Sequence, residues 1–228
     1  MAITETGNAT NSATTGTAVS VAHGLTINAG NVIVFQVHAN RTTTQTITDN
    51  NGAYAPTEHI QENTADGSAR YAIYSRVAGA SEPATYQWTL SEDNRWSVQI
   101  RVFSGVNNTT PWDVIPSAST RNGGVSTALT APTMTISTAG AMGIVLGIAD
   151  HNIATFSSST NGYGTEIEPA TPGQSQVSYI RIWATTGSTG TTGVTSSAST
   201  SWFAHQVALK PIVIIPIAMK HYRDMRVQ

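Results

Sequence analysis

A pattern of strands and turns occurs twice in this chain, and the second copy lies about 106 to 110 residues after the first. The stretch GNVIVFQV parallels GAMGIVLGI, the loop TDNNGAY parallels SSTNGYG, and YAIYSRVAG parallels YIRIWATTG. In each copy a Trp then opens an alternating apolar run. The paired starting points are Gly30 and Gly140, Thr48 and Ser158, Tyr71 and Tyr179, and Trp96 and Trp202. Because the order is kept while the spacing drifts only slightly, we interpret the pattern as an internal repeat.

Apolar and polar residues alternate with a period of two between the turns, and a helical period is almost absent. Runs such as NVIVFQVHA from Asn31 and WSVQIRVF from Trp96 are rich in β-branched and aromatic residues, which favour strands. The segments between such runs, including DNNGAY, RNGG and STNGYG, carry the Gly, Asn and Asp of tight turns. The sequence therefore predicts an all-β fold.

The two copies are not divided by a Pro- or Ser-rich linker or by a run of charge, and each alone would be only about 75 to 80 residues long. Packing the copies face to face buries both apolar faces and leaves Thr and Ser outside. We expect a single two-sheet antiparallel β-sandwich, jelly-roll-like, over residues 1–210, with repeats at about 30–106 and 140–211. Each copy then supplies part of one shared core, and Trp96 and Trp202 mark equivalent edges of it.

Charged residues are scarce and cysteine is absent, which excludes several classes of function. Charged side chains make up 11% of the chain and the net charge is -2 at pH 7; an ordinary globular protein has about 25%. Without a basic patch before residue 210, we expect no nucleic-acid binding. No apolar run approaches the roughly 18 residues that span a membrane, and the N-terminus does not read as a secretory signal. We therefore expect a soluble protein that binds no membrane.

The segment from Pro211 to the end differs from the rest of the chain. From Lys210 onward there are four basic residues and one acidic residue, a net charge of +3, which leaves -5 for the preceding 209 residues. Pro211 and Pro216 prevent a continuous helix, so we expect an extended C-terminal arm over residues 211–228. The arm could be a last strand on its own sandwich with a solvated basic tip, or it could add to a neighbouring subunit. Its candidate contact residues are Ile212, Ile214, Ile215, Ile217, Lys220, Tyr222, Arg223 and Arg226.

The sequence contains no nucleophile elbow, no phosphate-binding loop and no His-Glu-x-x-His motif. His38 and the pair Asp150 and His151 end equivalent strands and could ligate a metal, although turn residues are the more ordinary interpretation. Residues 58–62 place two Glu and a His in what we expect to be a solvated loop. The acidic turns at residues 49–51 and 92–94 offer oxygen ligands to calcium, again with an ordinary turn as the alternative. We predict a non-enzymatic protein with no catalytic residue, no cofactor and no metal site.

Exposed aromatic side chains would suggest a carbohydrate-binding module, which is the alternative from another class of function. Most of the Trp residues fall in alternating runs, where packing is the expected role: Trp88, Trp96, Trp183 and Trp202. Tyr54 and Tyr163 follow Asn-Gly turns in equivalent loops. We expect these two rings to be exposed and to be possible contacts for a partner protein or a glycan.

The cues GNVIVFQVHAN, YSRVAG, PATYQWTLS, VQIRVFSGV, PWDV, APTMTISTAGAMGIVLGIA and WFAHQVALKP occur in this order across residues 30–211. Together they resemble a family of phage-encoded β-sandwich virion proteins found among the structural genes of tailed phages. The resemblance implies a capsid decoration (cement) protein that binds the outside of the shell and stabilises the assembled state. The implied partners are the major capsid protein and neighbouring copies of the chain, as a homo-oligomer on the particle. The implied location is the capsid surface of the virion, after synthesis in the host cytoplasm, and a tail- or fibre-associated adhesion module is the alternative.

Overall fold

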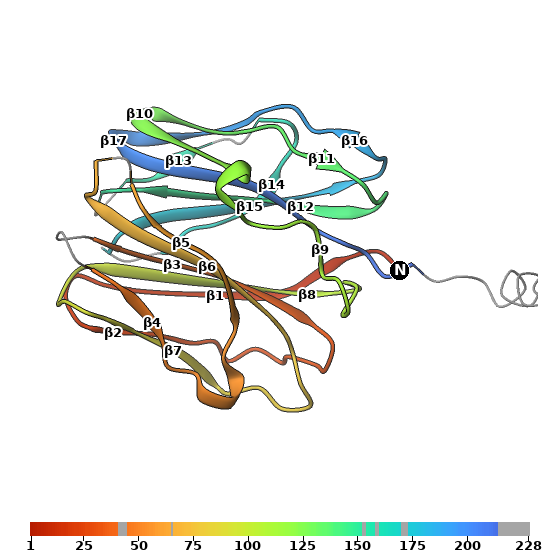
Figure 1. Ribbon diagram of the computed structural model, residues 1–228, viewed down its shortest axis with the longest axis horizontal. Coiled ribbons are helices and arrows are strands. Elements are labelled where there is room, and N and C mark those ends of the chain that lie inside the picture. The colour runs from red at the N-terminus through yellow and green to blue at the C-terminus, as the bar shows by residue number, and fades with distance from the viewer. Residues whose placement is uncertain (41–44, 65, 152–153, 158–159, 170–172, 214–228) are drawn as a thin grey trace, which may run out of the picture.

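The computed structural model describes residues 1–40, 45–64, 66–151, 154–157, 160–169 and 173–213, and its regular structure is almost entirely β (Figure 1). The strands are β1 (Thr4–Ala13), β2 (Ala18–Ala22), β3 (Val32–Asn40), β4 (Ile47–Asp49), β5 (Thr57–Asn63), β6 (Ala69–Val77), β7 (Thr85–Leu90), β8 (Trp96–Ser104), β9 (Trp112–Val114), β10 (Arg121–Ala131), β11 (Thr135–Ile136), β12 (Ala141–Ala149), β13 (Phe156–Ser157), β14 (Gly164–Ile167), β15 (Ser175–Trp183), β16 (Gly187–Ser188) and β17 (Thr192–Leu209). Two short 3-10 helices are η1 (Gly52–Tyr54) and η2 (Ala118–Thr120). Within the described ranges no helix is long and apolar enough to cross a membrane.

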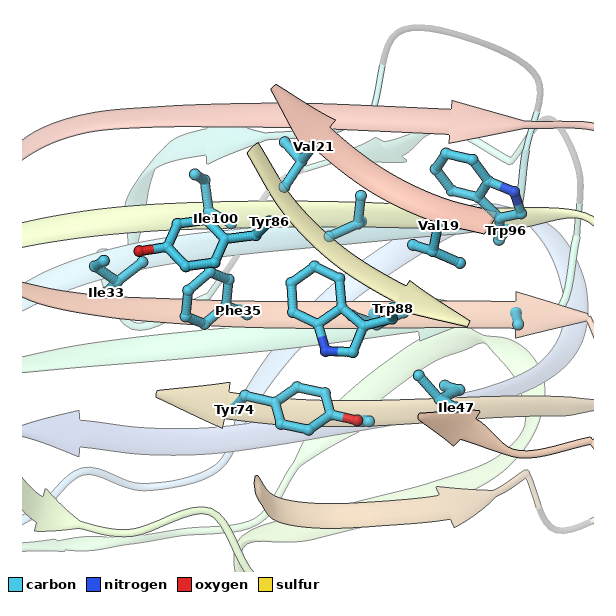
Figure 2. Close-up of a cluster of buried hydrophobic side chains, with 14 of the residues drawn as sticks. Val19, Val21, Ile33, Phe35, Ile47, Tyr74, Tyr86, Trp88, Trp96 and Ile100 are labelled. Carbon is cyan, nitrogen blue, oxygen red and sulfur yellow. The ribbon is translucent and has the colours of Figure 1, made fainter. Parts of the chain in front are cut away.

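The first half of the chain forms a five-stranded sheet and a three-stranded sheet that pack against each other. The large sheet is antiparallel with the order β1-β8-β3-β6-β5, and the small sheet has the order β2-β7-β4. Between them, Phe35 lies edge-on to Tyr86 and Trp88, with ring centroids 4.7 and 5.5 Å apart (Figure 2). Tyr74 lies against the same Trp88, with 5.8 Å between centroids. This buried aromatic cluster is a core that belongs to the first half alone.

The second half repeats this arrangement with longer strands. Its large sheet has the order β10-β17-β12-β15-β14, with β9 and β13 also paired to β17, while β11 and β16 form a separate ribbon. The β10–β17 register shifts between Ser126 and Ala128. Beyond this shift, Leu129 of β10 and Val194 of β17 point into a core of the second half. The outer parts of β10 and β17 thus replace the separate strands β2 and β7 of the first half.

The two large sheets have corresponding strand orders. Across the large sheets, β1, β8, β3, β6 and β5 correspond in turn to β10, β17, β12, β15 and β14. Trp96 lies opposite Ala39, and Trp202 lies opposite Ala149, at matching positions of the two sheets. The correspondence also includes β1 and β2. Both strands lie before residue 30, which is the predicted start of the first repeat.

One predicted pairing within the repeat is displaced by three residues. The registers of β6 on β3 and of β15 on β12 match Tyr179 with Tyr74, and not with Tyr71. The predicted match of Tyr71 with Tyr179 is therefore wrong, because a shift of three residues along a strand moves a side chain to the opposite face of the sheet. Tyr71 faces the other large sheet, whereas Tyr74 and Tyr179 face the cores of their own halves.

The two large sheets face each other and enclose the shared core that the sequence predicts, with Ile73, Val34, Ile144 and Val207 among its members. The all-β fold of antiparallel sheets packed together is confirmed. The fold has more layers than a single two-sheet sandwich, because each half also encloses its own core (Figure 1). The reason lies in the central strands: residues 32–39 of β3 and all of β12 are buried, and near-continuous apolar strands of this kind are covered on both faces.

Candidate functional site

The chain is held in place where β17 ends and the C-terminal arm begins. Pro211 is buried and forms an isolated antiparallel β-bridge with Val106. The Ile212 amide donates to the Gly105 carbonyl at 2.9 Å. The first residues of the arm therefore pack on their own sandwich, as the first of the two sequence-based interpretations expects for them.

The N-terminus lies beside this base of the arm. The Met1 amino group donates to the Ile212 carbonyl over 3.4 Å, and Ile3 is buried in the shared core. Gly105 has φ of +75° and approaches the chain at Ala2 so closely that a Cβ would collide with the Ala2 carbonyl. Both ends of the described chain therefore meet at one end of the shared core (Figure 1). We call this region, residues 1–3, 105–108 and 210–213, the terminal face.

The terminal face exposes apolar side chains. Met1 is 70% exposed and Val213 is 66% exposed. The remaining predicted contact residues of the arm lie outside the described residues: Ile214, Ile215, Ile217, Lys220, Tyr222, Arg223 and Arg226. The structure thus places Ile212 at an anchored base, and the docking of the arm on a partner stays a prediction.

A polar network is buried between the two large sheets, where the sequence predicts an apolar core. Its centre is Arg101 of β8, which crosses to β15 of the second half. The Arg101 guanidinium donates through Nε to Ser178 Oγ and through Nη2 to the Ser178 carbonyl, both at 2.7 Å. Its Nη1 donates to Glu5 Oε1 at 2.9 Å. Burial lowers the pKa of Arg101 to about 10, and the Glu5 carboxylate opposes this shift, so the side chain stays charged at neutral pH.

The network continues from Ser178 toward the middle of the interface. Ser178 Oγ donates to Gln99 Oε1 at 3.0 Å, and Gln99 Nε2 donates to Gln36 Oε1 at 2.7 Å. Gln36 Nε2 then donates to the Gly147 carbonyl of β12 at 3.1 Å. We call Glu5, Gln36, Gln99, Arg101 and Ser178 the polar seam. It joins β1, β8 and β3 of the first half to β15 and β12 of the second.

The polar seam occupies one side of the interface only. By the sheet registers, the counterpart of Arg101 in the other repeat is Val207, and the counterpart of Ser178 is Ile73. Both of these counterparts are buried in the apolar shared core. The Arg101 and Ser178 pair is therefore present at one of the two equivalent places and replaced by an apolar pair at the other. This asymmetry favours one docking of the repeats, because a buried charge needs its partners.

Two buried histidines lie at the same interface. His38 and Asp150 do come together, as the sequence suggested. Burial lowers the pKa of His38 to about 4, while Asp150 and the Ser175 carbonyl, 3.2 Å from His38 Nδ1, oppose this effect. His205 lies between the Tyr71 hydroxyl, 2.8 Å from its Nε2, and Thr120 Oγ1. Burial lowers its pKa to about 3, and the nearby Arg121 acts in the same direction.

The other candidate polar groups have structural roles. Residues 58–62 lie in strand β5 and not in the expected loop; His59 Nε2 lies 2.7 Å from Ser75 Oγ, and Glu62 pairs with Arg121 at 2.5 Å. The expectation of a loop failed because residues 57–63 show little alternation of apolar and polar side chains. They form a strand because they pair with β6. Asp93 accepts from the Gly16 amide at 2.7 Å. The described residues hold no group of three or more His, Asp or Glu that could bind a metal.

The predicted exposure of the paired loop tyrosines is wrong for Tyr163. This residue is 6% exposed, and its hydroxyl lies 3.1 Å from the side-chain amide of Gln206. Gly143, against which the hydroxyl lies, leaves room for the ring inside the second half. Tyr54 is half-buried and lies beneath the Arg76 guanidinium, 5.5 Å from the ring centroid. The core role predicted for Trp88, Trp96 and Trp202 is confirmed, while Trp183 is half-buried beneath Arg181.

Inspection of the sequence missed the polar seam, although a signal was present. Gln36, Gln99 and Arg101 interrupt the apolar runs VIVFQVHA and WSVQIRVF at positions that point toward the other half. A polar residue at such a position of a strand covered on both faces indicates a buried hydrogen-bond network. Comparison of the chain with protein-family models, with curated proteins and with solved structures found no match, so the functional argument rests on the terminal face and the polar seam themselves.

Proposed function

We propose that this chain is a non-enzymatic structural protein of a phage particle, which binds the outside of the capsid shell and reinforces it. The observation that carries the proposal is the anchored base of the C-terminal arm. The bridge between Pro211 and Val106 fixes the point from which residues 214–228 continue, next to the N-terminus. Those residues combine apolar side chains with three basic residues and one acidic residue, a composition suited to an apolar groove beside an acidic patch.

The rest of the structure is consistent with a rigid scaffold for such an arm. The shared core and the polar seam hold the two halves together, and each half also encloses a core of its own. His38 Nδ1, His205 Nε2 and the Arg101 guanidinium, all buried at the interface, each lie within hydrogen-bonding distance of a protein group. The strand and turn cues resemble those of phage virion proteins. From this resemblance we infer the partners, which are the major capsid protein and neighbouring copies of this chain.

We expect a variant that ends at Val213 to lose its place on the shell. Removal of residues 214–228 takes away the apolar and basic contacts but leaves the anchored base intact, so the sandwich should still fold. Purified shells would be incubated with the full chain or with the truncated chain, and bound protein would be quantified after sedimentation. We expect occupancy to fall at least about tenfold, a loss of roughly 1.4 kcal/mol or more in binding free energy.

A second variant separates the two contributions of the arm. Lys220→Gln, Arg223→Gln and Arg226→Gln together remove the basic tip and keep the apolar residues. If the tip faces an acidic patch, this variant should bind more weakly at low salt and show less dependence on salt than the full chain. Full occupancy by the truncated chain would overturn the proposed role of the arm.

The copy number distinguishes the shell from the tail. Quantitative mass spectrometry of purified particles would compare this chain with the major capsid protein. Hundreds of copies would support decoration of the shell. A handful of copies would move the chain to the tail or to a fibre, where receptor or glycan binding is the alternative and the loop of Tyr54 is the first place to test.

A further inference from the structure

The repeat places an arginine at the same position in both halves. In β6 and β15 it follows the matched tyrosines, as Arg76 in the first half and as Arg181 in the second. Each guanidinium lies over an aromatic ring. The Arg76 guanidinium is 5.5 Å from the ring centroid of Tyr54, and the Arg181 guanidinium is 4.0 Å from the ring centroid of Trp183. The two halves can therefore be compared at this position.

The first half supplies its arginine with a carboxylate. Arg76 Nε donates to both carboxylate oxygens of Glu82, at 3.1 and 3.0 Å. The same carboxylate accepts from the Gly79 amide and from the Tyr86 hydroxyl, each at 2.6 Å. The Glu82 side chain is only 2% exposed. The first half thus binds its own carboxylate in a closed site, through charge-assisted hydrogen bonds.

The second half keeps the arginine and lacks the acid. Arg76 and Glu82 are six residues apart, whereas the residue six positions after Arg181 is Gly187. Residues 169–223 contain no Asp or Glu at all. The ion pairs formed between described residues involve other arginines, and none of them includes Arg181. The second half therefore offers this guanidinium no acid of its own.

The surroundings leave the Arg181 guanidinium accessible. Arg181 is half-buried, and the segment that follows β15, residues 184–188, is exposed throughout. Gly162 lies beside the guanidinium, because a Cβ on this glycine would be 3.4 Å from Arg181 Nη1. Stacking on Trp183 covers a face of the guanidinium plane, while the N–H groups point outward within that plane. Stacking therefore leaves these donors available for two parallel bonds to a carboxylate.

This position adjoins the terminal face. The Trp183 carbonyl accepts from the Gly140 amide at 2.7 Å. Gly140 in turn lies against Pro211, whose Cγ would be 3.7 Å from a Cβ on the glycine. Ile182 stands between Arg181 and Trp183, points to the opposite face of the strand, and is 44% exposed. A positive charge and an exposed apolar side chain therefore lie close to the base of the arm.

We propose that Arg181 and Trp183 form a docking point for the carboxylate of an acidic side chain on a partner protein, in the place where the first half binds its own Glu82. Trp183 packs against two cores and lies beneath the guanidinium, so its ring is not a platform for a sugar. The exposed Ile182 suits an apolar side chain beside the acid. The choice of a protein as the source of the carboxylate rests on the proposed function, but the carboxylate site does not.

The first test uses the isolated full chain, with acetate as the probe. NMR would follow the Nε–Hε signals of the arginines while acetate replaces chloride at constant ionic strength. We expect the Arg181 signal to shift and to saturate, with half of the effect at about 30 mM acetate. Arg76 is the filled control, because Glu82 already occupies it, and its signal should not move. Arg95, which has no ion pair among the described residues, is the control for an ordinary cation. Equal, non-saturating shifts at Arg181 and Arg95 would overturn the site.

A second probe distinguishes the sources of the carboxylate. Glucuronate carries its carboxylate on a sugar ring, whereas N-acetylglutamate carries it on the side chain of an amino acid. We expect the two probes to bind at Arg181 about as tightly as acetate, since the carboxylate is the group that is recognised. Binding of glucuronate at least about tenfold tighter than that of acetate would identify an acidic sugar as the ligand and would overturn the choice of a protein.

The last test measures docking on purified shells. Arg181→Met removes the charge and keeps an apolar stem over Trp183, and Arg95→Met is the matched control with the same change in charge. We expect Arg181→Met to lower the affinity for shells about threefold, as loss of a partly exposed ion pair would, and Arg95→Met to leave it unchanged. Equal affinities of Arg181→Met and the full chain would overturn the docking role. If the full chain itself does not bind shells, the proposed function and the choice of partner both fail, while a saturating shift at Arg181 still supports the carboxylate site.

Discussion

We expect Arg101→Met to lower the free energy of unfolding by about 3 to 5 kcal/mol, because it breaks a buried network by removing one partner. Methionine fills much of the space but donates no hydrogen bond. Ser178 would lose the donors to its hydroxyl and its carbonyl, and Glu5 would lose its buried cation. Unfolding in urea at pH 7, followed by circular dichroism and Trp fluorescence, measures the loss.

Arg121→Met is the matched control for this experiment. Arg121 also joins the two halves, through its pair with Glu62, but both side chains are 28% exposed. Exposed ion pairs contribute only about 1 kcal/mol or less. A loss for Arg101→Met that is no greater than the loss for Arg121→Met would contradict the idea that the polar seam holds the halves together.

The counterpart positions in the other repeat suggest how the lost free energy of unfolding can be recovered. Val207 and Ile73 occupy the positions that correspond to Arg101 and Ser178. Arg101→Val combined with Ser178→Ile copies that apolar pair and removes the Arg101 donor together with the Ser178 hydroxyl, while Glu5 and the Ser178 carbonyl still lose their donor. Because such replacements are often neutral or stabilising, we expect the double variant to lose less stability than the sum of the two single variants.

The class of fold and the order of the repeated strands could be predicted from the sequence because both depend on local patterns. Alternation identifies strands, Gly and Asn mark turns, and Trp96 and Trp202 identify matching strand starts. The repeat predicted from the sequence did not include strands β1 and β10, because they consist mainly of Thr, Ser, Asn, Ala and Gly. They are edge strands whose place is set by pairing with β8 and β17, which a local pattern does not show.

The number of layers and the polar seam depend on which faces are covered, and that is a property of the packed molecule. The near-continuous apolar run of β12 indicated a strand buried on both faces, and a single two-sheet sandwich could not cover both. The burial of Tyr163 has a similar origin, since the space that holds it is created by Gly143 on a neighbouring strand. Equivalent turns in the two halves therefore place Tyr54 and Tyr163 in different surroundings.

The second large effect that we expect is acid destabilisation between pH 6.5 and pH 4, carried by His38 and His205. Burial lowers both pKa values, to about 4 and about 3. An unfolded chain binds these protons from about pH 6.5 downward, while the folded chain excludes them, so stability present above pH 6.5 is lost as the pH falls through this window. At about 1.4 kcal/mol for each pKa unit, the combined loss is on the order of 5 kcal/mol.

Burial raises the pKa of Glu168, which follows β14, to about 7. This shift acts in the opposite direction over part of the range, so the measurement is best made in the Glu168→Gln variant. The free energy of unfolding would be obtained from urea titrations at several pH values. His205→Gln copies Gln99, its counterpart in the first half, and can still bond to Tyr71 and Thr120. It should remove about one proton from the slope of stability against pH below 6.5. An unchanged slope would show that His205 takes up its proton as readily in the folded chain as in the unfolded chain, which would contradict this prediction.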